Sequence, residues 1–453
     1  MVGTFDLENL GDLLFPLVAH RELCARLGDV ELELFSYRAL DPPSWPFKVR
    51  PVGSLAARLG EFALLIVGGG HLVRGDAGVA PGYLPTDAAT SHPYGLWLTP
   101  TLLAEAAGVP VAWNALGAID SVPDSASPLV AAALSGVDYL AVRDLPAARF
   151  VRAHAPSAAA VVVPDTVFGI GALLDEDVRF DARLVLRELG VEGGYVVVQP
   201  SGALRAYRGA VESLAAAAAA RGLDVVELAC GPCHDDLAGR LALSVPTLAV
   251  EPWPAPLVTA AILAGAEAVI ASSLHAGVIA TASGVPLHRP RAATGGKHET
   301  LDLLPGVQFL PADGDDEEVE ARFGRSAPSS QATGHVAALA HHWDEVAARA
   351  TGRDQRGPRR GVIELVESLP EVLAAPERRQ REAIARLTAS HDVERWRDAE
   401  ARAALVVQAD LDADRTAHLE SVLARRSVRM ALHFDALVER WRNRSRGSDA
   451  GAG

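Results

Sequence analysis

The sequence predicts an α/β protein with two Rossmann-like domains that face a central cleft, and three observations favour this class. Short apolar strands alternate with helices from the first residues to about residue 311, which indicates parallel βαβ units. The 453 residues, 49% of them hydrophobic, are enough for two or three domains with real cores. From about residue 312 the composition becomes charged and then helical, so we expect a C-terminal helical extension.

The first domain is expected to cover residues 1–172. Its helices include residues 12–26 and 101–107, and its strand candidates are residues 32–37, 64–67, 109–113, 139–142 and 160–163. Only Met1, Val2 and Gly3 stand where a full first strand would normally lie. Either this strand is a stub, or the natural start of the chain lies further upstream.

The second domain is expected to cover residues 173–311 and to begin with a connecting helix at residues 182–188. Its strand candidates are residues 195–199, 223–228, 247–250, 268–271, 286–288 and 307–310. Residues 312–334 are interpreted as a linker, because they are charged and then rich in Ser, Gly and Ala.

Residues 335–453 are interpreted as a helical extension with a disordered end. Met430, Phe434, Leu437 and Trp441 recur at helical spacing, which places them on one face. This face is expected to pack on the body of the protein or on a second copy, so a homodimer through the tail is one hypothesis. A basic amphipathic helix that lies on a membrane is the weaker alternative.

Composition excludes several classes of protein. The formal net charge of −15 and the 5% aromatic content disfavour nucleic-acid binding. The sequence has no uninterrupted run of 18 apolar residues, so no membrane span is predicted. The N-terminus lacks the features of a signal peptide. We therefore expect a cytoplasmic protein, with peripheral attachment to the inner membrane face as the alternative.

Three cysteines make no disulfide framework, and two of them form Cys230-Gly-Pro-Cys233. This segment follows a strand and precedes a helix, which suits a redox pair, half of a metal site or a plain turn. The plain turn is favoured, because no second cysteine pair completes a zinc site. No metal-ligand cluster is apparent, and no metal is expected.

The most informative stretch is the turn Ser272-Ser273-Leu274-His275. It follows an apolar strand and opens a helix of small residues that stops at Gly284. Such a turn lies at the carboxyl end of a parallel sheet, where open α/β proteins bind ligands, and it presents the positive end of a helix. A histidine there can move protons beside a bound anion. The alternative is a capped helix with an ordinary histidine.

Two loops of the first domain are candidates for the same cleft. Asn9 and Asp12 flank a glycine at the start of a helix, where Asp12 either faces substrate or caps the helix. Gly68, Gly69 and Gly70 follow a strand and let a ligand approach the backbone; a glycine turn without a ligand is the alternative. Neither a Gly-x-Gly-x-x-Gly nor a Walker pattern is present, which disfavours nicotinamide cofactors and ATP hydrolysis.

Two further strand ends carry charged residues. Arg143 and Asp144 follow one strand, and Asp165 follows the last strand of the first domain. An arginine in this position can bind a carboxylate or phosphate through two parallel hydrogen bonds, or it can pair internally with the aspartate.

Taken together, these loops resemble the polysaccharide pyruvyl transferase family over about residues 1–310. The resemblance lies in the order and spacing of short motifs, each weak alone. The matching segments are Asn9–Asp12, Gly68–Leu72, Asn114–Gly117, Val142–Asp144, Pro164–Asp165, Leu274–His275 and Gly284–Pro286.

The resemblance implies a two-domain GT-B-like fold and phosphoenolpyruvate as the donor co-substrate, with no cofactor. The product would be a pyruvate ketal on two hydroxyls of a glycan or lipid-linked sugar acceptor, in cell-surface polysaccharide biosynthesis. Arg143 would bind the donor and His275 would be catalytic. The remaining motif residues would face the cleft and the acceptor: Asn9, Asp12, Gly68, Gly69, Gly70, Asn114, Asp144 and Asp165. Tyr94 and Trp97 could stack on the sugar.

The sequence departs from the family at one position, because Ser273 stands where the family usually has arginine before Leu-His. A buried charge-assisted hydrogen bond is worth about 1.5–3 kcal/mol, so the loss matters. The candidate replacements for donor binding are Arg289, Arg291, Lys297, Ser272 and Ser273. Two other functions stay open, a glycosyltransferase that uses a nucleotide sugar and a catalytically silent scaffold.

Overall fold

The computed structural model describes residues 1–42, 45–75, 80, 82–83, 91–118, 122–231, 236, 241–291, 298–311 and 322–352. All of them belong to one compact unit, residues 1–374. The second unit, residues 375–453, lies outside the described residues, as do Lys297, Cys233 and the helical stripe at Met430.

The first half contains seven short strands, and every pairing between them is parallel. They are β1 (Leu34–Ser36), β2 (Val49–Pro51), β3 (Leu65–Val67), β4 (Gly70–Val73), β5 (Val111–Ala118), β6 (Tyr139–Val142) and β7 (Ala160–Val162). Val2 bridges Phe35 of β1 and Val67 of β3 in parallel, and thus takes the place of a first strand. The spatial order is therefore β2, β1, Val2, β3, β5, β6 and β7, with β4 beside the end of β5.

The second half contains a six-stranded parallel sheet. Its strands are β8 (Tyr195–Val198), β9 (Asp224–Glu227), β10 (Thr247–Ala249), β11 (Ala268–Ile270), β12 (Leu287–Pro290) and β13 (Val307–Leu310). They are arranged in the order β10, β9, β8, β11, β12 and β13. When the strands of this half are numbered along the chain, this is the Rossmann order 3-2-1-4-5-6. The first half follows the same order when Val2 is counted as its first strand. The predicted class, α/β with two Rossmann-like sheets, is confirmed.

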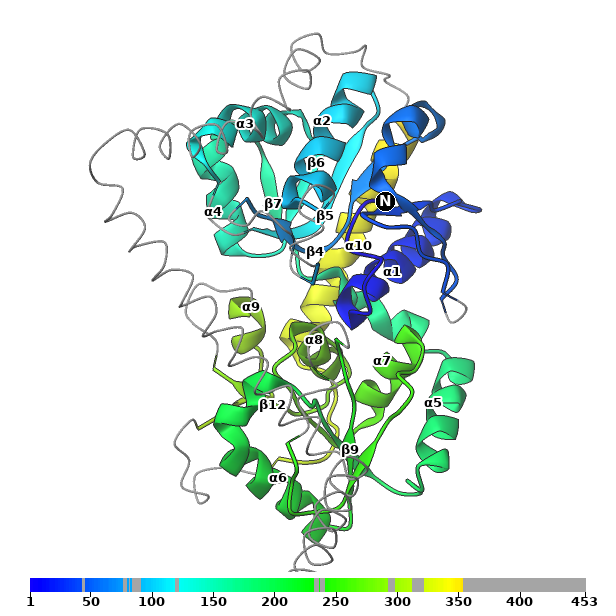
Figure 1. Cartoon of the computed structure of the whole chain (residues 1–453), viewed down its shortest axis with the longest axis vertical. Helices are drawn as coiled ribbons and strands as arrows, with labels where there is room; N and C mark the ends of the chain where they lie inside the picture. Colours follow the sequence, from blue (N-terminus) through cyan, green and yellow to red (C-terminus); the bar gives the residue numbers. More distant parts are fainter. Residues whose placement is uncertain are drawn as a thin grey trace, which may run out of the picture. The chain divides into compact units, whose positions relative to one another are not determined.

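Helices connect the strands in both halves (Figure 1). The α-helices are α1 (Leu10–Leu27), α2 (Leu98–Ala107), α3 (Ser127–Gly136), α4 (Leu145–His154), α5 (Glu176–Glu188), α6 (Arg208–Ala220), α7 (Pro256–Gly265), α8 (Leu274–Ala282), α9 (Glu299–Asp302) and α10 (Ser330–Thr351). The 3₁₀ helices are η1 (Val52–Ser54), η2 (Ala56–Glu61), η4 (Pro93–Leu96), η5 (Asp124–Ala126), η6 (Thr166–Leu173) and η7 (Gly202–Tyr207). No helix in the described part of the chain is both long and apolar enough to span a membrane.

Helix α10 follows the second sheet in sequence but packs on the first half, beside α1, η6 and β6 (Figure 1, yellow). Ser329 caps it by accepting a hydrogen bond from the Ala332 N–H at 3.1 Å. Its apolar face is formed by Leu339, Trp343 and Val346, which are buried. The helix is thus an integral part of the first half's core.

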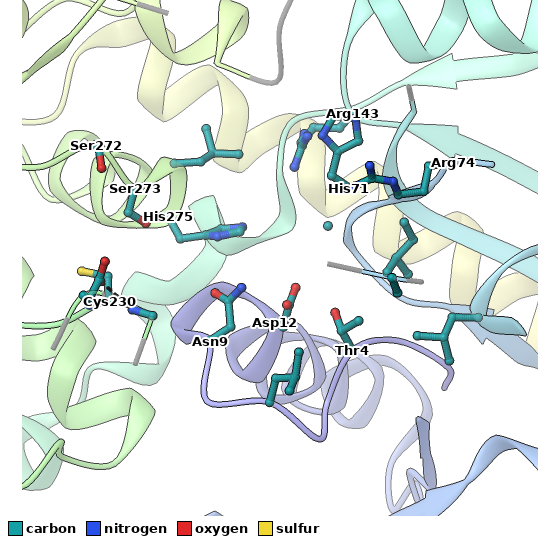
Figure 2. Close-up of a pocket in the computed structure, with 18 of the residues that line it drawn as sticks. Thr4, Asn9, Asp12, His71, Arg74, Arg143, Cys230, Ser272, Ser273 and His275 are labelled. Carbon is teal, nitrogen blue, oxygen red and sulfur yellow. Dashed lines mark hydrogen bonds between the residues drawn. The ribbon is translucent and has the colours of Figure 1, made fainter. Parts of the chain in front are cut away.

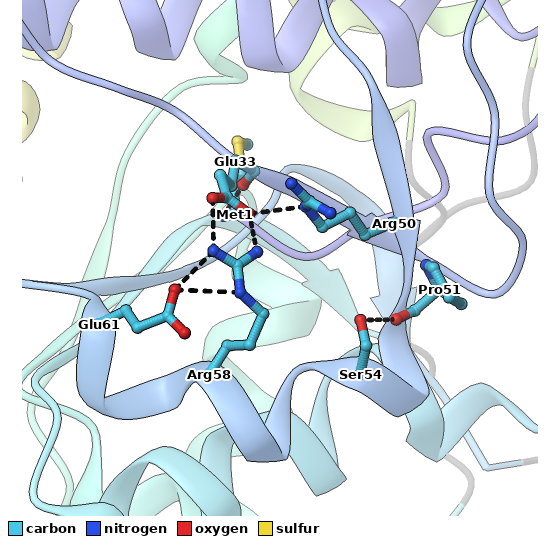
Figure 3. Close-up of polar contacts among 7 residues, drawn as sticks. All are labelled: Met1, Glu33, Arg50, Pro51, Ser54, Arg58 and Glu61. Atoms are coloured by element: carbon cyan, nitrogen blue, oxygen red, sulfur yellow. Dashed lines mark hydrogen bonds and ion pairs between the residues drawn. The ribbon is translucent and has the colours of Figure 1, made fainter.

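A polar cluster fixes the segment before β1 (Figure 3). The Met1 ammonium donates to the Glu33 carbonyl oxygen at 2.7 Å, and Arg50 and Arg58 both contact the Glu33 carboxylate. Hydrogen bonds from Arg58 are the largest cause of a lowered pKa for Glu33; partial burial opposes them. The cluster holds Val2 in position between its two neighbouring strands.

Candidate active site at the two points where strand order reverses

A cavity of about 470 Å³ lies where the carboxyl ends of both sheets meet. In each half its lining follows the strands at which the order reverses, the place where open α/β sheets bind ligands. The first half supplies Thr4, Leu7, Asn9, Asp12, Tyr37, Gly70, His71, Leu72, Arg74, Ala80, Pro93, Leu96 and Arg143. The second half supplies Gln199, Ser201, Cys230, Gly231, Asp236, Ser272, Ser273, Leu274 and His275.

Arg143 and His275 line this cavity, and the buried Asp165, which was predicted to face the cleft, lies behind them and contacts both. Arg143 follows β6, Asp165 caps η6 and His275 lies in the first turn of α8. Oδ2 of Asp165 lies 3.5 Å from Nη1 of Arg143 and 3.4 Å from Nε2 of His275. The contact to His275 has ion-pair distance without hydrogen-bond alignment. One carboxylate therefore links the arginine and the histidine that the sequence predicted for catalysis.

Asp165 is ionised in this setting. Its burial, with 4% exposure, raises the pKa, but His275, Arg143 and a hydrogen bond from the Val167 N–H together lower it further, so the net pKa is below the ordinary value. A carboxylate beside an imidazole orients the ring.

His275 crosses from the second half and packs on α1 of the first half (Figure 2). A Cβ atom at Gly11 would lie 1.8 Å from Nδ1 of His275, so only glycine leaves room for the ring. Phe15 packs edge-on against the same ring, with 5.3 Å between the centroids. The Leu10 N–H also donates to the Cys230 carbonyl at 2.9 Å, which joins the two halves at this point.

The three glycines after β3 have separate structural reasons. A Cβ at Gly68 would lie 2.8 Å from the Val2 carbonyl oxygen, and one at Gly69 would lie 2.4 Å from Phe15. Gly70 has φ +93°, a left-handed conformation that favours glycine, and it alone of the three lines the cavity. Two of the three glycines therefore serve packing, and one of these supports the phenyl ring beside His275.

Arg143 is 4% exposed, yet it lines the cavity. Its Nε lies 3.4 Å from Asp144, and its Nη2 has no hydrogen-bond partner among the described residues. Gly117 makes room for this nitrogen, because a Cβ there would lie 2.5 Å from it. An open guanidinium nitrogen in a buried setting is suited to an anionic ligand.

The wall from the second half is largely satisfied by its own hydrogen bonds. Oε1 of Gln199 accepts from the N–H groups of Ser272 and Ser273 at 3.0 and 2.8 Å, and its Nε2 donates to Asp236. Ser272 donates through Oγ to Ser201 at 2.9 Å, and Ser273 caps α8 by accepting from the Ala276 N–H. The backbone N–H groups of Ser272 and Ser273, which were expected to bind phosphate, are therefore already hydrogen-bonded to Gln199.

The backbone donors of the Cys230 segment are likewise hydrogen-bonded within the second half. The N–H groups of Cys230 and Gly231 both donate to Oδ2 of Asp236 at 2.8 Å. Burial, and secondarily Asp236, raises the pKa of the Cys230 thiol well above its ordinary value. A buried thiol held in the protonated form is not a redox nucleophile, which favours the plain turn.

Two arginines proposed as donor contacts lie elsewhere. Arg289 is buried on β12, where its Nη1 lies 3.3 Å from Asp302 and its Nε donates to the Pro290 carbonyl. Burial lowers the pKa of Arg289, and the Asp302 charge opposes this. Arg291 is exposed and lies over the Phe309 ring, 3.9 Å from its centroid. Neither residue lines the cavity.

Other predicted cleft residues also lie behind the cavity. Asp144 caps α4 by accepting from the Ala147 N–H at 2.9 Å, besides its contact with Arg143. Tyr94 and Trp97 are buried in the core of the first half, where Trp97 packs edge-on against Trp113, so they are not available to stack on a sugar. Among the described residues, Tyr37 is the tyrosine, tryptophan or phenylalanine that lines the cavity.

Asn114 belongs to a buried network with α10. Nε2 of His342 lies 2.9 Å from Oδ1 of Asn114, and Nδ1 lies 3.2 Å from the Tyr139 hydroxyl. Since the amide oxygen only accepts, Nε2 carries the proton and Nδ1 accepts from Tyr139. Burial, followed by Arg26 and His341, lowers the pKa of His342 to about 3.

Sequence reasoning missed several cavity residues that carry chemistry: Thr4, Tyr37, His71, Arg74, Gln199, Ser201 and Asp236. Thr4, Gln199 and Ser201 follow the central strand of their sheets, so the rule on reversal points would have found them. His71 and Arg74 lie in and after β4, a strand that the sequence did not predict. Among the described residues, no group of three or more His, Cys, Asp or Glu side chains is arranged to hold a metal ion.

Solved structures with a similar fold are sugar-modifying enzymes. A UDP-GlcNAc 2-epimerase from Methanocaldococcus jannaschii is 11% identical, with 72% of this chain and 97% of that chain covered and a TM-score of 0.44. The UDP-GlcNAc 2-epimerase from Neisseria meningitidis bound to UDP-GlcNAc is 11% identical, with 80% of this chain and 97% of that chain covered and a TM-score of 0.43. E. coli ADP-heptose LPS heptosyltransferase II is 11% identical, with 82% of this chain and 97% of that chain covered and a TM-score of 0.36. These likenesses concern the fold alone.

No curated protein matches the chain. The family model for polysaccharide pyruvyl transferase matches residues 9–288, which is more than half of the 453 residues. This range holds the helix start at Asn9, the glycine turn, Arg143, Asp165 and His275. The chain belongs to the polysaccharide pyruvyl transferase family.

Proposed function

We propose that this protein transfers the enolpyruvyl group of phosphoenolpyruvate to two hydroxyls of one sugar, forming a pyruvate ketal in cell-surface polysaccharide biosynthesis. The observation that carries the proposal is the group of Arg143, Asp165 and His275 at the cavity. It combines an open cationic nitrogen with a histidine beside an ionised carboxylate. Family membership supports a transferase.

Arg143 is suited to the donor carboxylate. A guanidinium presents parallel N–H groups that match the two oxygens of a planar carboxylate, and Nη2 is available for one of them. The contacts to Asp144 and Asp165 fix the plane of the side chain. Binding the donor here would bring its reacting carbons close to the imidazole of His275.

His275 is suited to general acid and base chemistry, and the Asp165 carboxylate lies 3.4 Å from its Nε2, where it orients the ring. The protonated ring gives a proton to the methylene carbon, so that C2 becomes electrophilic. The oxygen of one sugar hydroxyl then bonds to C2, and its proton returns to His275. The C2–O bond to phosphate breaks with its electron pair on phosphate, the second hydroxyl oxygen bonds to C2, and its proton leaves with phosphate. The products are one ketal and one hydrogen phosphate.

The test is a calorimetric titration of the purified protein with phosphoenolpyruvate, combined with a phosphate-release assay over a panel of sugar acceptors. Wild type should bind saturably, and Arg143→Ala should bind at least about tenfold more weakly. His275→Ala should keep most of the affinity and lose about 10²–10⁴-fold in turnover.

No saturable binding up to several millimolar would overturn the proposal. Saturable binding of a nucleotide sugar in its place would favour the glycosyltransferase alternative. Near-normal turnover by His275→Ala would show that the histidine is not the acid and base.

A further inference from the structure

The donor site has fewer positive charges than its ligand requires. Phosphoenolpyruvate carries up to three negative charges, whereas Arg143 is flanked by two carboxylates and the turn before His275 carries serines at 272 and 273. Arg143 lies between the carboxylates of Asp144 and Asp165, at 3.4 and 3.5 Å, so this buried group is negative overall unless His275 is protonated. A second cation is needed to hold a phosphate dianion.

Arg74 is the other arginine that lines the cavity among the described residues. It follows β4 directly, on the same side of the cavity as His71 and Arg143 and across from Ser272 and Ser273 (Figure 2). Its backbone is fixed, because its carbonyl oxygen accepts a hydrogen bond from the indole N–H of Trp97 at 3.1 Å. Trp97 is 0% exposed and packed against Trp113, so the anchor is rigid.

The opposite wall offers no arginine or lysine among the described residues. Besides His275 and the Cys230 thiol, its polar groups are amides, hydroxyls and the Asp236 carboxylate, and Gln199 already binds the N–H groups of Ser272 and Ser273. Arg289 and Arg291 of the second half lie outside the cavity. Both arginines that line the cavity among the described residues, Arg74 and Arg143, therefore come from the first half.

We propose that Arg74, from the first half, binds the phosphate group of phosphoenolpyruvate. Arg143 then binds the carboxylate, whose single charge suits a guanidinium already flanked by two aspartates. The assignment rests on the proposed donor. It makes Arg74 a residue that determines which anions this chain accepts.

The experiment is a set of calorimetric titrations with three probes: phosphoenolpyruvate, inorganic phosphate and pyruvate. The full-length variants are Arg74→Gln, Arg74→Lys and Arg143→Gln, and Arg152→Gln on exposed α4 is the matched control. Arg74→Gln should weaken phosphoenolpyruvate and phosphate binding about tenfold to hundredfold and leave pyruvate affinity unchanged. Arg143→Gln should weaken pyruvate more than phosphate, and Arg74→Lys should restore part of the affinity, because it keeps the charge.

The outcomes separate the two proposals. Wild-type affinity for phosphoenolpyruvate in Arg74→Gln would overturn the role of Arg74 and leave the donor assignment standing. Binding of phosphate but not phosphoenolpyruvate by wild type, lost in Arg74→Gln, would support the anion contact and overturn the donor. If wild type binds none of the probes, both proposals fail. If Arg74→Gln weakened the binding of phosphate and of pyruvate equally, with an unchanged melting temperature, the assignment of the phosphate to Arg74 and of the carboxylate to Arg143 would be overturned.

Discussion

His275 and His342 lie in two regions of the molecule that use the same side chain in opposite ways. Each ring packs beside an aromatic residue, Phe15 in one case and Tyr139 in the other. His342 is 0% exposed, and neutral partners bind both of its nitrogens, which keeps the ring uncharged. His275 is 12% exposed at the cavity, where its Nε2 lies 3.4 Å from the Asp165 carboxylate.

The difference teaches that surroundings, rather than residue type, decide which histidine is available for chemistry. A closed set of neutral hydrogen bonds converts a histidine into a structural link, whose changes appear in stability. An open ring beside a charge exchanges protons with a ligand, and its changes appear in turnover. Substitutions at His342 are therefore expected to change stability, and substitutions at His275 are expected to change turnover.

The largest effect is expected for Gly11→Ala. The new Cβ would meet Nδ1 of His275 at 1.8 Å, so the ring must leave its present position beside Asp165. A displacement of about 1 Å costs about 100-fold in turnover. Alanine favours the helix, so the melting temperature should not fall in proportion. Phosphate release and thermal unfolding, measured together, check this.

Gly60→Ala is the matched control, because a Cβ there meets nothing within 4 Å. It should keep full turnover. If Gly11→Ala also kept full turnover, the contact between α1 and His275 would have no part in catalysis.

An intermediate effect is expected on stability at low pH, through His342. The folded pKa of about 3 lies below the ordinary 6.5. The unfolded chain thus binds a proton below pH 6.5 that the folded chain rejects. The stability is complete above pH 6.5 and is lost as pH falls toward 3, by about 2 kcal/mol at pH 5. Chemical denaturation at pH 7 and pH 5 measures it.

His342→Gln, which can still donate to Asn114, should lose about that much of the pH dependence. His154→Gln at the end of α4 is the control, because His154 is not among the groups that lower the pKa of His342, so this variant should keep the wild-type slope. An unchanged slope in His342→Gln would mean that another group causes the acid sensitivity.

The smallest effect is expected for Gly117→Ala. Its Cβ would lie 2.5 Å from Nη2 of Arg143, so the guanidinium must shift and lose part of its anion contact. We expect phosphoenolpyruvate affinity to fall about tenfold, consistent with one weakened charge-assisted hydrogen bond. Calorimetry measures the change, with Gly171→Ala as control because a Cβ at Gly171 meets nothing within 4 Å. Undiminished affinity would show that the donor does not use Nη2.

Much of the fold was predictable, because strand and helix periods follow from local sequence. Helix α5 was predicted at 182–188 but begins at Glu176, since Asp175 caps it by accepting from the Val178 N–H. Strand β4 was missed because its glycine-led start, Gly70, has a positive φ and no strand propensity. The chain after residue 312 was interpreted by composition, which does not reveal that α10 packs on the first half.

The site was predictable where a motif ends a strand, as for Arg143 and His275. Position in sequence does not tell whether a basic side chain points to a cavity or into the core. The prediction that Arg289 contacts the donor at the cavity was therefore wrong. Its pairing with Asp302 depends on a tertiary contact between β12 and α9. Arg74 was overlooked because its place at the cavity depends on β4 lying beside β5, where Gly70 pairs with Leu116 and Val73 with Ala118.

The position of α10 sets a limit for anyone who wishes to shorten this protein. Removing everything after residue 335 looks harmless from composition, since it cuts where the helical tail was expected to begin. It would take away Leu339, His342 and Trp343 and would leave Asn114 and Tyr139 facing an empty groove. A shortened protein meant to test the tail should therefore keep residues 330–352 and begin its deletion only beyond them.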